Sequence, residues 1–365
     1  MKSQNNEKVL ILIPSLEPDI KLVSYVNKMK ECGLINIIIV DDGSGKAYQP
    51  IFDKLADNGC VVLHHSQNRG KGCALKTGFY YIKENYNRFD CVVMVDSDGQ
   101  HAIEDVVRVV ELSKQNPKAL TLGVRDFNKP GIPIKSLIGN RFASFVFFTL
   151  YGKSLADTQT GLRAFGMPLL EFMLSVRGDR FEYEIQMLIS CVQADIPMQM
   201  NPIQVIYEDD NDGTHFKPLR DSFKIIRTMF SGFTRFLSSS IVSAAVDIGI
   251  AWFLLDFLWT FLQSEYLRIL TATVIARAIS VGFNYLLNRN FVFQDKKSGG
   301  KSLIRYLLLC VLIIILSTTG VYGLHIGFRV NEKIGKIICD TLLFILSYQV
   351  QQRWVFAKEN RKYDE

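Results

Sequence analysis

Two phosphate-binding motifs are missing from this 365-residue sequence. It contains no GxxxxGK[ST] loop, and no GxGxxG follows its first apolar run. These absences argue against a P-loop ATPase and against a dinucleotide-dependent oxidoreductase. The net charge of +6 is modest, and no concentrated basic face of the kind that binds nucleic acid is present, so no nucleic-acid partner is expected.

Cysteine is sparse and shows no pattern. The seven cysteines are an odd number, form no CxxC pair and are irregularly spaced, which argues against a disulfide framework. The apolar patch Val9–Ile13 is shorter than the core of a secretory signal, and no small-residue cleavage site follows it. We therefore expect a buried strand at this patch and a cytosolic location for the N-terminal half.

What the sequence has in excess is apolar length in its C-terminal half. Up to about residue 219 the apolar runs are short, but beyond Phe236 several approach the ~20 residues that a membrane-spanning helix needs. We expect four spans, near residues 236–262, 267–287, 303–324 and 334–352, in a multi-pass protein of the cell membrane. By the positive-inside rule, basic residues beside the spans place the N-terminal half and both termini in the cytoplasm. These residues are Lys217, Arg220, Lys224, Arg227 and Arg235 before the first span, and Arg289, Lys296, Lys297, Lys301 and Arg305 between the second and third.

The four spans contain an internal repeat. The first hairpin opens with Arg235-Phe236-Leu237 and closes with NYLLNRNFVF, residues 284–293. The second opens with Arg305-Tyr306-Leu307 and closes with SYQVQQRWVF, residues 347–356. Aromatic and basic residues are ordinary anchors at span ends, but agreement at both ends of both hairpins favours duplication.

Two charged residues fall inside the first two spans. Asp247 lies about as far into the first span as Arg277 lies into the second from the other side. An unpaired charge near mid-membrane is strongly disfavoured. We therefore expect Asp247 and Arg277 to pair.

The first hundred residues alternate short β-branched runs with amphipathic stretches. This alternation predicts a doubly wound α/β sheet, with buried strands at KVLILIP, INIIIVDDGS, CVVLHH and DCVVMVD. Ligands of such sheets gather at the carboxyl ends of the strands. Polar motifs stand at four of these ends, at Pro14–Asp19, Asp41–Ser44, Asn68–Gly72 and Asp96–Gln100.

The fourth motif, DSDGQ, carries the strongest chemical signal. In an extended segment, residues two apart project to the same side, so Asp96, Asp98 and Gln100 would present their oxygens together. Such ligands suit Mg²⁺ or Mn²⁺, which can stabilise a departing diphosphate. An acidic surface turn is the alternative, but the position at a strand's carboxyl end favours a metal site.

Two other motifs have the chemistry of a nucleotide site. Asp41 and Asp42 close the second strand, where an acid can accept hydrogen bonds from a ribose or a base, although a turn that caps the next helix would use the same residues. Gly70 and Gly72 permit close approach of the backbone, and Lys71 stands at a helix N-terminus, where phosphates bind.

Two segments have the pattern of basic amphipathic helices. Residues 132–153 and 217–235 combine several phenylalanines with lysine and arginine, which indicates helices able to lie in the membrane interface. Packing against the sheet is the alternative for both segments.

Together these motifs resemble glycosyltransferase family 2, with its GT-A fold, and most closely the polyprenyl-phosphate sugar synthases. IPSLEPD, DDGS, NRGKGCAL, DSDGQH, GVR and DTQTGLRAF match in order and spacing over residues 8–235, with Pro18 replacing the family's Asn-Glu register. The repeated hairpins resemble a GtrA-like domain. The resemblance implies a Rossmann-like, mostly parallel catalytic domain at residues 1–216, an interface helix at 217–235, an all-α four-helix membrane domain at 236–357 and a polar tail at 358–365.

The resemblance also implies a function and residue roles. The function is a metal-dependent, inverting hexosyltransferase that uses a GDP- or UDP-hexose and a polyprenyl phosphate, undecaprenyl or dolichyl. Asp98, Arg125 and Arg141 would be catalytic, and Asp96, Asp98 and Gln100 would bind Mg²⁺ or Mn²⁺. The nucleotide sugar would contact Pro14, Leu16, Glu17, Asp41, Asp42, Lys71, Asp96 and Ser97, and the acceptor phosphate would contact Arg125, Arg141, Arg163 and Arg220.

One family feature is replaced in this chain. Where the family has a Ser-Lys pair, an acidic loop runs from Asp209 to His215, and His215 or Arg220 would substitute for the phosphate contact. Arginines suit a lipid phosphate because it is already an anion at neutral pH and needs positioning rather than a general base.

Three alternatives remain open. A processive polysaccharide synthase carries Gln-x-x-Arg-Trp, but here Gln349 and Gln351 flank the required position before Arg353-Trp354. A transporter of lipid-linked sugar would use the spans for movement and the soluble half for regulation. The membrane half could also serve only as an anchor for the enzyme.

Overall fold

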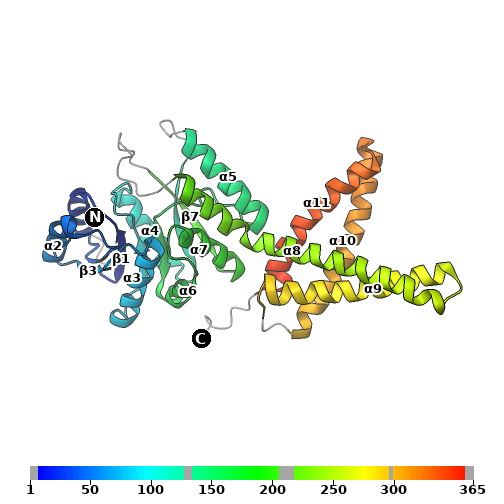
Figure 1. Ribbon diagram of the computed structural model, residues 1–365. Coiled ribbons are helices and arrows are strands. Elements are labelled where there is room, and N and C mark those ends of the chain that lie inside the picture. Colours follow the sequence, from blue (N-terminus) through cyan, green and yellow to red (C-terminus); the bar gives the residue numbers. More distant parts are fainter. Residues whose placement is uncertain (1–6, 127–133, 205–217, 296–298, 358–365) are drawn as a thin grey trace. The chain divides into compact units, whose positions relative to one another are not determined.

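The computed structural model describes residues 7–126, 134–204, 218–295 and 299–357. The chain divides into two compact units, Met1–Met229 with Asn360–Glu365, and Phe230–Glu359. The strands of the first unit are β1 (Val9–Ser15), β2 (Asn36–Asp41), β3 (Val61–His64), β4 (Cys91–Met94), β5 (Leu120–Arg125), β6 (Arg163–Gly166) and β7 (Met198–Ile203). Its helices are α1 (Lys21–Glu31), α2 (Gln49–Asp57), α3 (Lys71–Asn85), α4 (Ile103–Gln115), α5 (Ile134–Tyr151), α6 (Leu170–Ser175) and α7 (Glu182–Gln193), with single turns η1 (Lys46–Tyr48) and η2 (Met167–Leu169) (Figure 1).

The seven strands form one sheet in the order β3-β2-β1-β4-β6-β5-β7. All neighbours are parallel except β6, which runs antiparallel to β4 and to β5. The chain builds outward from β1 through β2 to β3, and then returns to place β4 on the other side of β1. The sheet therefore has a topological switch point at β1 and β4, where α/β proteins bind their ligands. The mostly parallel α/β fold expected from the sequence is confirmed.

The strands form where the sequence is continuously apolar, because both faces of the sheet are covered. All seven residues of β1 are buried, as parallel strands between helical layers require. Helix α1 covers part of the sheet with Leu22, Val26 and Met29 on its buried face, at the spacing of one helical stripe. The resulting core is contiguous across β1, β2, β4, α1, α2 and α4.

Helix α5 has apolar residues on two faces. Phe147, Leu150 and Tyr151 are buried within the first unit, and the Tyr151 hydroxyl donates to the Met229 carbonyl at 2.6 Å. Phe142 and Phe145 are exposed, at 52% and 66%. One face of α5 therefore packs within the first unit. The location of its exposed face in the membrane interface stays a prediction.

The second unit is helical. Its elements are α8 (Pro218–Phe257, which begins in the first unit), η4 (Leu258–Thr260), α9 (Glu265–Leu287), α10 (Gly299–Phe328), α11 (Glu332–Val350) and the π-helical turns η5 (Asn288–Val292) and η6 (Gln351–Val355). Helix α8 is one uninterrupted helix (Figure 1). The segment 217–235, which the sequence analysis treats as a separate interface helix, and the first expected span are thus mostly parts of one element.

Three helical stretches of the described residues are long and apolar enough to cross a membrane: Phe223–Thr260, Glu265–Val292 and Gly300–Phe328. Helix α11 is not among them, because its first half carries four charged residues, Glu332, Lys333, Lys336 and Asp340. The fourth expected span stays a prediction.

The two hairpins end in the same way. The π-helical turn η5 begins at Asn288, the fifth residue of NYLLNRNFVF, and η6 begins at Gln351, the fifth residue of SYQVQQRWVF. Asn288 Nδ2 donates to Gln351 Oε1 at 3.1 Å, so these equivalent positions meet. Because π-helical turns are rare, their recurrence in register supports a duplication.

Candidate active site

The loops that follow β1, β2, β3 and β4 lie at one rim of the sheet, since these strands are parallel neighbours. Pro14 is buried in β1, and Leu16 and Glu17 follow it. Glu17 has a positive φ of 46°, and its backbone N–H donates to Ser44 Oγ at 2.8 Å. The first two predicted motifs are thus joined to each other.

Asp41 and Asp42 are buried and bind groups of the protein. Asp41 Oδ1 accepts from the N–H and the hydroxyl of Ser44 at 2.9 and 2.6 Å. Asp42 accepts from the backbone N–H groups of Arg69 and Gly70 at 2.9 and 2.7 Å. The two carboxylates therefore shape the loops after β2 and β3. Their expected contacts with a nucleotide stay predictions.

Lys71, the first residue of α3, ties the loop after β3 to the loop after β4. Its Nζ lies 2.7 Å from Asp96 Oδ1 and 2.9 Å from Glu184 Oε1 of α7. Burial by itself lowers the pKa of Lys71, but the two carboxylates outweigh burial and raise it. Burial likewise opposes the charge of Asp96, but Lys71 and His101 hold the pKa of that carboxyl well below its usual range. Lys71 and Asp96 are therefore both charged at neutral pH.

The segment after β4 turns instead of continuing as a strand. β4 ends at Met94, Gly99 has a positive φ of 72°, and Asp98 Oδ1 accepts from the Gln100 N–H at 3.0 Å. The expectation that alternation along an extended strand aligns the three oxygens is therefore wrong, because a turn sets their directions. Desolvation, followed by the negative charge of Asp96, raises the pKa of Asp98.

This donor set fits a hard divalent cation that is shared with a substrate. Two acidic groups lie close enough for the charge of Asp96 to disfavour the charged form of Asp98, and a cation would relieve that repulsion. Among the described residues, no three His, Cys, Asp or Glu side chains form a group that could hold a metal by themselves. Mg²⁺ sites commonly use one or two carboxylates and complete their shell with waters and substrate phosphates.

Gly161 lets the DTQTGLRAF segment lie against Asp96. A Cβ at this position would lie 1.9 Å from Asp96 Oδ2, so a larger side chain would displace the carboxylate. The DTQTGLRAF motif therefore supports the DSDGQ motif by close packing. Sequence reasoning gave this glycine no role.

Arg125, at the end of β5, is oriented by Asp157. Its Nε and Nη2 donate to Asp157 Oδ2 and Oδ1 at 2.6 and 3.0 Å, which is the bidentate geometry that fixes a guanidinium most firmly. Asp157 is completely buried, whereas the Arg125 side chain is 25% exposed.

Arg163 does not fit the expected contact with an acceptor phosphate. It lies in β6 with no exposed surface, and its guanidinium donates to the carbonyls of Thr160 and Glu184 at 2.9 and 2.6 Å. Arg163 cannot meet a phosphate because its side chain lies in the interior of the sheet, which the motif spacing could not show. We assign Arg163 a role in supporting the rim of the sheet.

Arg141 is exposed on α5. Its neighbour Asn140 is buried and donates to the Ala156 carbonyl at 2.8 Å, which fixes α5 beside the loop that carries Asp157. The acidic loop 209–215 lies outside the described residues, as does the side chain of Arg220.

Three supporting residues were missed by sequence reasoning. Glu184 holds Lys71, Asp157 orients Arg125, and Asn140 fixes α5. Asp157 stands inside a motif that was recognised, so its position beside known site residues was a usable signal. Glu184 and Asn140 lie in ordinary helical sequence, where only spatial proximity reveals them.

Comparisons with known proteins identify the families to which the two halves of the chain are similar. Residues 22–173 match the profile of Glycosyl transferase family 2, and residues 235–356 match that of GtrA/DPMS, transmembrane domain. A UDP-N-acetylglucosamine–dolichyl-phosphate N-acetylglucosaminyltransferase of Methanococcus voltae is 30% identical over 220 residues, which are 55% of this chain and 86% of the relative. The chain belongs to glycosyltransferase family 2. Its C-terminal half carries the GtrA/DPMS transmembrane domain. The family resemblance inferred from the motifs is confirmed.

Other similarities extend the picture. A dolichyl-phosphate beta-glucosyltransferase of Saccharomyces cerevisiae is 26% identical over 219 residues, covering 53% of this chain and 62% of that protein. The glucosyl-3-phosphoglycerate synthase of Mycobacterium tuberculosis, solved with Mn²⁺, UDP-glucose and phosphoglyceric acid, is 17% identical with a TM-score of 0.46, over 61% of this chain and 79% of that one.

Proposed function

We propose that this family 2 glycosyltransferase moves a hexose from a nucleotide sugar to a polyprenyl phosphate at the cytoplasmic face of the membrane, with inversion at the anomeric carbon. One observation carries the proposal: the acidic pair Asp96 and Asp98 lies at the switch point of the sheet, in a chain that continues into a GtrA/DPMS transmembrane domain. The named relatives from Methanococcus voltae and Saccharomyces cerevisiae, both dolichyl-phosphate glycosyltransferases, support the acceptor class.

The donor would bind at the rim of β1 and β4. Asp96, Asp98 and Gln100 would hold Mg²⁺ or Mn²⁺, and a cation bound there supplies charge stabilisation to the departing nucleoside diphosphate. Lys71 keeps Asp96 charged and in place, and it stands at the N-terminus of α3, where the backbone N–H groups favour an anion. Pro14, Leu16, Glu17, Asp41, Asp42 and Ser97 would complete the donor side.

The acceptor would approach along α5. Its exposed Phe142 and Phe145 suit the acyl boundary of the membrane, and Arg141 on the same helix would meet the lipid phosphate. Arg125, oriented by Asp157, would position the phosphate for in-line attack. The phosphate oxygen forms the new bond to the anomeric carbon as the bond to the nucleoside diphosphate breaks, and no proton has to be removed from the nucleophile.

A nucleotide-sugar screen against a polyprenyl phosphate tests the proposal. Full-length protein in detergent is incubated with labelled UDP- and GDP-hexoses and Mg²⁺ or Mn²⁺, and lipid-bound label is measured. We expect transfer with one donor and at least about a 100-fold loss of turnover in Asp98→Ala. The matched control Asp90→Ala, an exposed acid at the opposite end of β4, should stay within twofold. Lipid-bound label that is equal in Asp98→Ala and the wild type would refute the role of this site.

A further inference from the structure

His65 is a buried histidine directly after β3, and both of its ring nitrogens have partners. Its side chain is 4% exposed, as is that of Asp42. His65 Nδ1 lies 2.7 Å from Asp42 Oδ1, and His65 Nε2 lies 2.9 Å from Thr77 Oγ1. Asp42 follows β2 and Thr77 lies in α3. The imidazole therefore ties the loop after β2 to a helix that begins at the rim of the sheet.

The other partners of Asp42 decide the direction of these hydrogen bonds. Asp42 Oδ1 also accepts from the Arg69 N–H at 2.9 Å, and Oδ2 accepts from the Gly70 N–H at 2.7 Å. Because a carboxylate only accepts hydrogen bonds, we assign the proton of the neutral imidazole to Nδ1. Nε2 then accepts from the Thr77 hydroxyl. The hydrogen bonds thus run in one direction, from Thr77 through His65 to Asp42.

The Asp42 carboxylate in turn holds the backbone that leads into α3. The two residues whose N–H groups it accepts directly precede Lys71, the first residue of the helix. Gly70 has a positive φ of 102°, and a Cβ at this position would lie 2.5 Å from the Asp179 carbonyl oxygen. The segment before α3 is therefore both bonded to Asp42 and closely packed against the residues that precede α7.

The helix end held in this way is the one that faces the candidate donor site. Within the described part of the chain, no side chain caps α3 at Gly70, and a helix begins with N–H groups that have no partner inside the helix. Such groups favour an anion. Lys71 adds a positive charge at the same end and lies 2.7 Å from Asp96. A shift of the segment before α3 would therefore move the groups expected to meet a diphosphate.

A neighbouring pair shows by contrast what is particular to His65. His64 Nδ1 lies 2.9 Å from Asp41 Oδ2, but the His64 side chain is 42% exposed, so water can replace either partner. The pair of His65 and Asp42 is closed to water, where a polar group without a partner is costly. Loss of the imidazole would thus leave Asp42 without a donor that water could replace.

We propose that His65 is a positioning residue of the donor site. Its Nδ1–H holds the Asp42 carboxylate, and the carboxylate holds the backbone before α3, so that the N-terminus of the helix and Lys71 meet the diphosphate of the nucleotide sugar. His65 acts through Asp42 and does not itself touch the substrate. The identity of the ligand rests on the proposed function.

Nucleotide binding to full-length protein in detergent tests this role without requiring transfer. The probes are UDP and GDP with Mn²⁺, and dissociation constants are measured by isothermal titration calorimetry. His65→Leu removes the Nδ1–H donor, whereas His65→Asn keeps an amide donor for Asp42. For the nucleotide that the wild type binds more tightly, we expect at least about a tenfold weaker affinity in His65→Leu, because a hydrogen bond to a charged group is worth that much. His65→Asn should restore most of this loss.

Thr121→Val is the control for loss of a buried hydrogen bond elsewhere in the first unit. Thr121 has no exposed surface, and its hydroxyl accepts from Gln199 Nε2 at 2.6 Å, between β5 and β7. This variant should melt at a lower temperature and bind the nucleotide within about twofold of the wild type. If His65→Leu does not fold, Thr77→Val takes its place, because loss of the Thr77 hydroxyl leaves the imidazole free to turn away from Asp42. Nucleotide affinity should then be weaker in Thr77→Val than in Thr121→Val.

Transfer kinetics separate positioning of the donor from a general loss of structure. With a nucleotide hexose and citronellyl phosphate, His65→Leu should raise the KM for the donor at least about tenfold and leave the KM for the acceptor within about twofold. Equal rises in both KM values would overturn the positioning role. Wild-type nucleotide affinity in His65→Leu, or equal losses in His65→Leu and His65→Asn, would overturn it too. Absence of transfer in the wild type would instead defeat the proposed function, while the calorimetric comparison would still decide the role of His65.

Discussion

Lys71 and Asp96 form a salt bridge between two loops of the sheet rim, with Lys71 Nζ 2.7 Å from Asp96 Oδ1. The lysine begins α3 and the aspartate follows β4, so the contact joins the loops on either side of the candidate donor site. Glu184 of α7 lies 2.9 Å from the same Nζ. The ammonium group of Lys71 thus holds Asp96, an expected metal ligand, from a neighbouring loop.

Replacing Lys71 should destabilise the protein and weaken donor binding. Lys71→Met leaves Asp96 and Glu184 facing each other without a cation, and loss of hydrogen bonds to charged groups typically costs about 1.5–3 kcal/mol. Lys83→Met is the matched control on the same helix, because Lys83 pairs with Glu171 and the two side chains are 48% and 62% exposed. Such surface pairs contribute about 0–1 kcal/mol. We expect a lower melting temperature and a higher KM for the nucleotide sugar only in Lys71→Met. Identical melting curves for the two variants would contradict the structural role of this bridge.

Gly161→Ala should reduce turnover while leaving the fold intact. The added methyl group would lie 1.9 Å from Asp96 Oδ2 and would push the carboxylate away from its position beside Lys71. Gly139→Ala is the control, since no atom lies within 4 Å of the Cβ that would be added there. Steady-state kinetics should show at least about a tenfold loss of kcat in Gly161→Ala alone, equivalent to about 1.4 kcal/mol. Wild-type kcat in both variants would show that Asp96 can move without effect.

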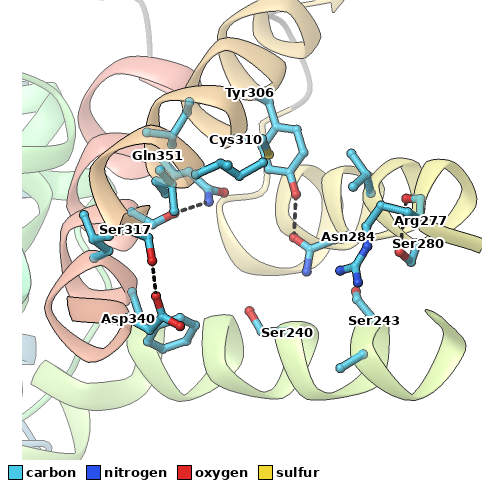
Figure 2. A pocket seen from close by; sticks show the side chains of 18 of the residues that line it. Ser240, Ser243, Arg277, Ser280, Asn284, Tyr306, Cys310, Ser317, Asp340 and Gln351 are labelled. Atoms are coloured by element: carbon cyan, nitrogen blue, oxygen red, sulfur yellow. Dashed lines mark hydrogen bonds between the residues drawn. The ribbon is translucent and has the colours of Figure 1, made fainter. Parts of the chain in front are cut away.

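Charge reversal tests the pair formed by Asp247 and Arg277, the two charges that the sequence analysis pairs. Arg277 Nη2 lies 3.1 Å from Asp247 Oδ2, beside the cavity among α8, α9, α10 and α11 (Figure 2). Each single change, Asp247→Arg or Arg277→Asp, places two like charges together in the membrane unit, where unpaired charge is strongly disfavoured. We expect less inserted, monodisperse protein for each single variant and recovery in the double variant. The yield after detergent extraction and size-exclusion chromatography measures this. Full yields for both single variants would show that the 3.1 Å contact contributes little.

Buried thiols predict a loss of stability at high pH. Burial raises the pKa of Cys91 from 9.0 to about 11. An unfolded chain would therefore lose this proton before the folded chain does, and the stabilisation is complete below the ordinary thiol pKa and disappears as the pH rises to about 11. We expect the melting temperature to fall between pH values of about 8 and about 10.5, and to fall less in Cys91→Ala. Cys32→Ala, at an exposed site, should behave as the wild type does; equal pH slopes in all three proteins would exclude this contribution.

Much of the fold follows from local patterns that the chain carries in its sequence. The apolar runs that become β1 to β4 are continuous because each strand is covered on both faces. Such runs can be recognised in the sequence without knowing which strands are neighbours. The antiparallel strand β6 was not expected, since it depends on where the chain inserts Arg163–Gly166 between β4 and β5. The order of strands in a sheet depends on how the connections cross over it, and the periodicity of the local sequence carries no information about those connections.

The candidate site divides in the same way. Asp96 and Asp98 could be selected from their types and their place after a strand, but the turn at Gly99 that orients them could not. Arg125 and Arg163 were both expected to contact the acceptor phosphate. The fold separates them, because one ends a strand beside Asp157 and the other is completely buried in the sheet.

By itself, the sequence determined which residues can take part in the chemistry and where the apolar segments begin and end. It also determined that two similar hairpins follow an α/β half. Only the tertiary structure decided that Glu184 holds Lys71, that Gly161 lies against Asp96, and that the closing turns of the two hairpins meet in the membrane unit. The physical reason is distance along the chain. Periodicity acts over a few residues, whereas these contacts join segments that meet only after the sheet and the helical hairpins have assembled.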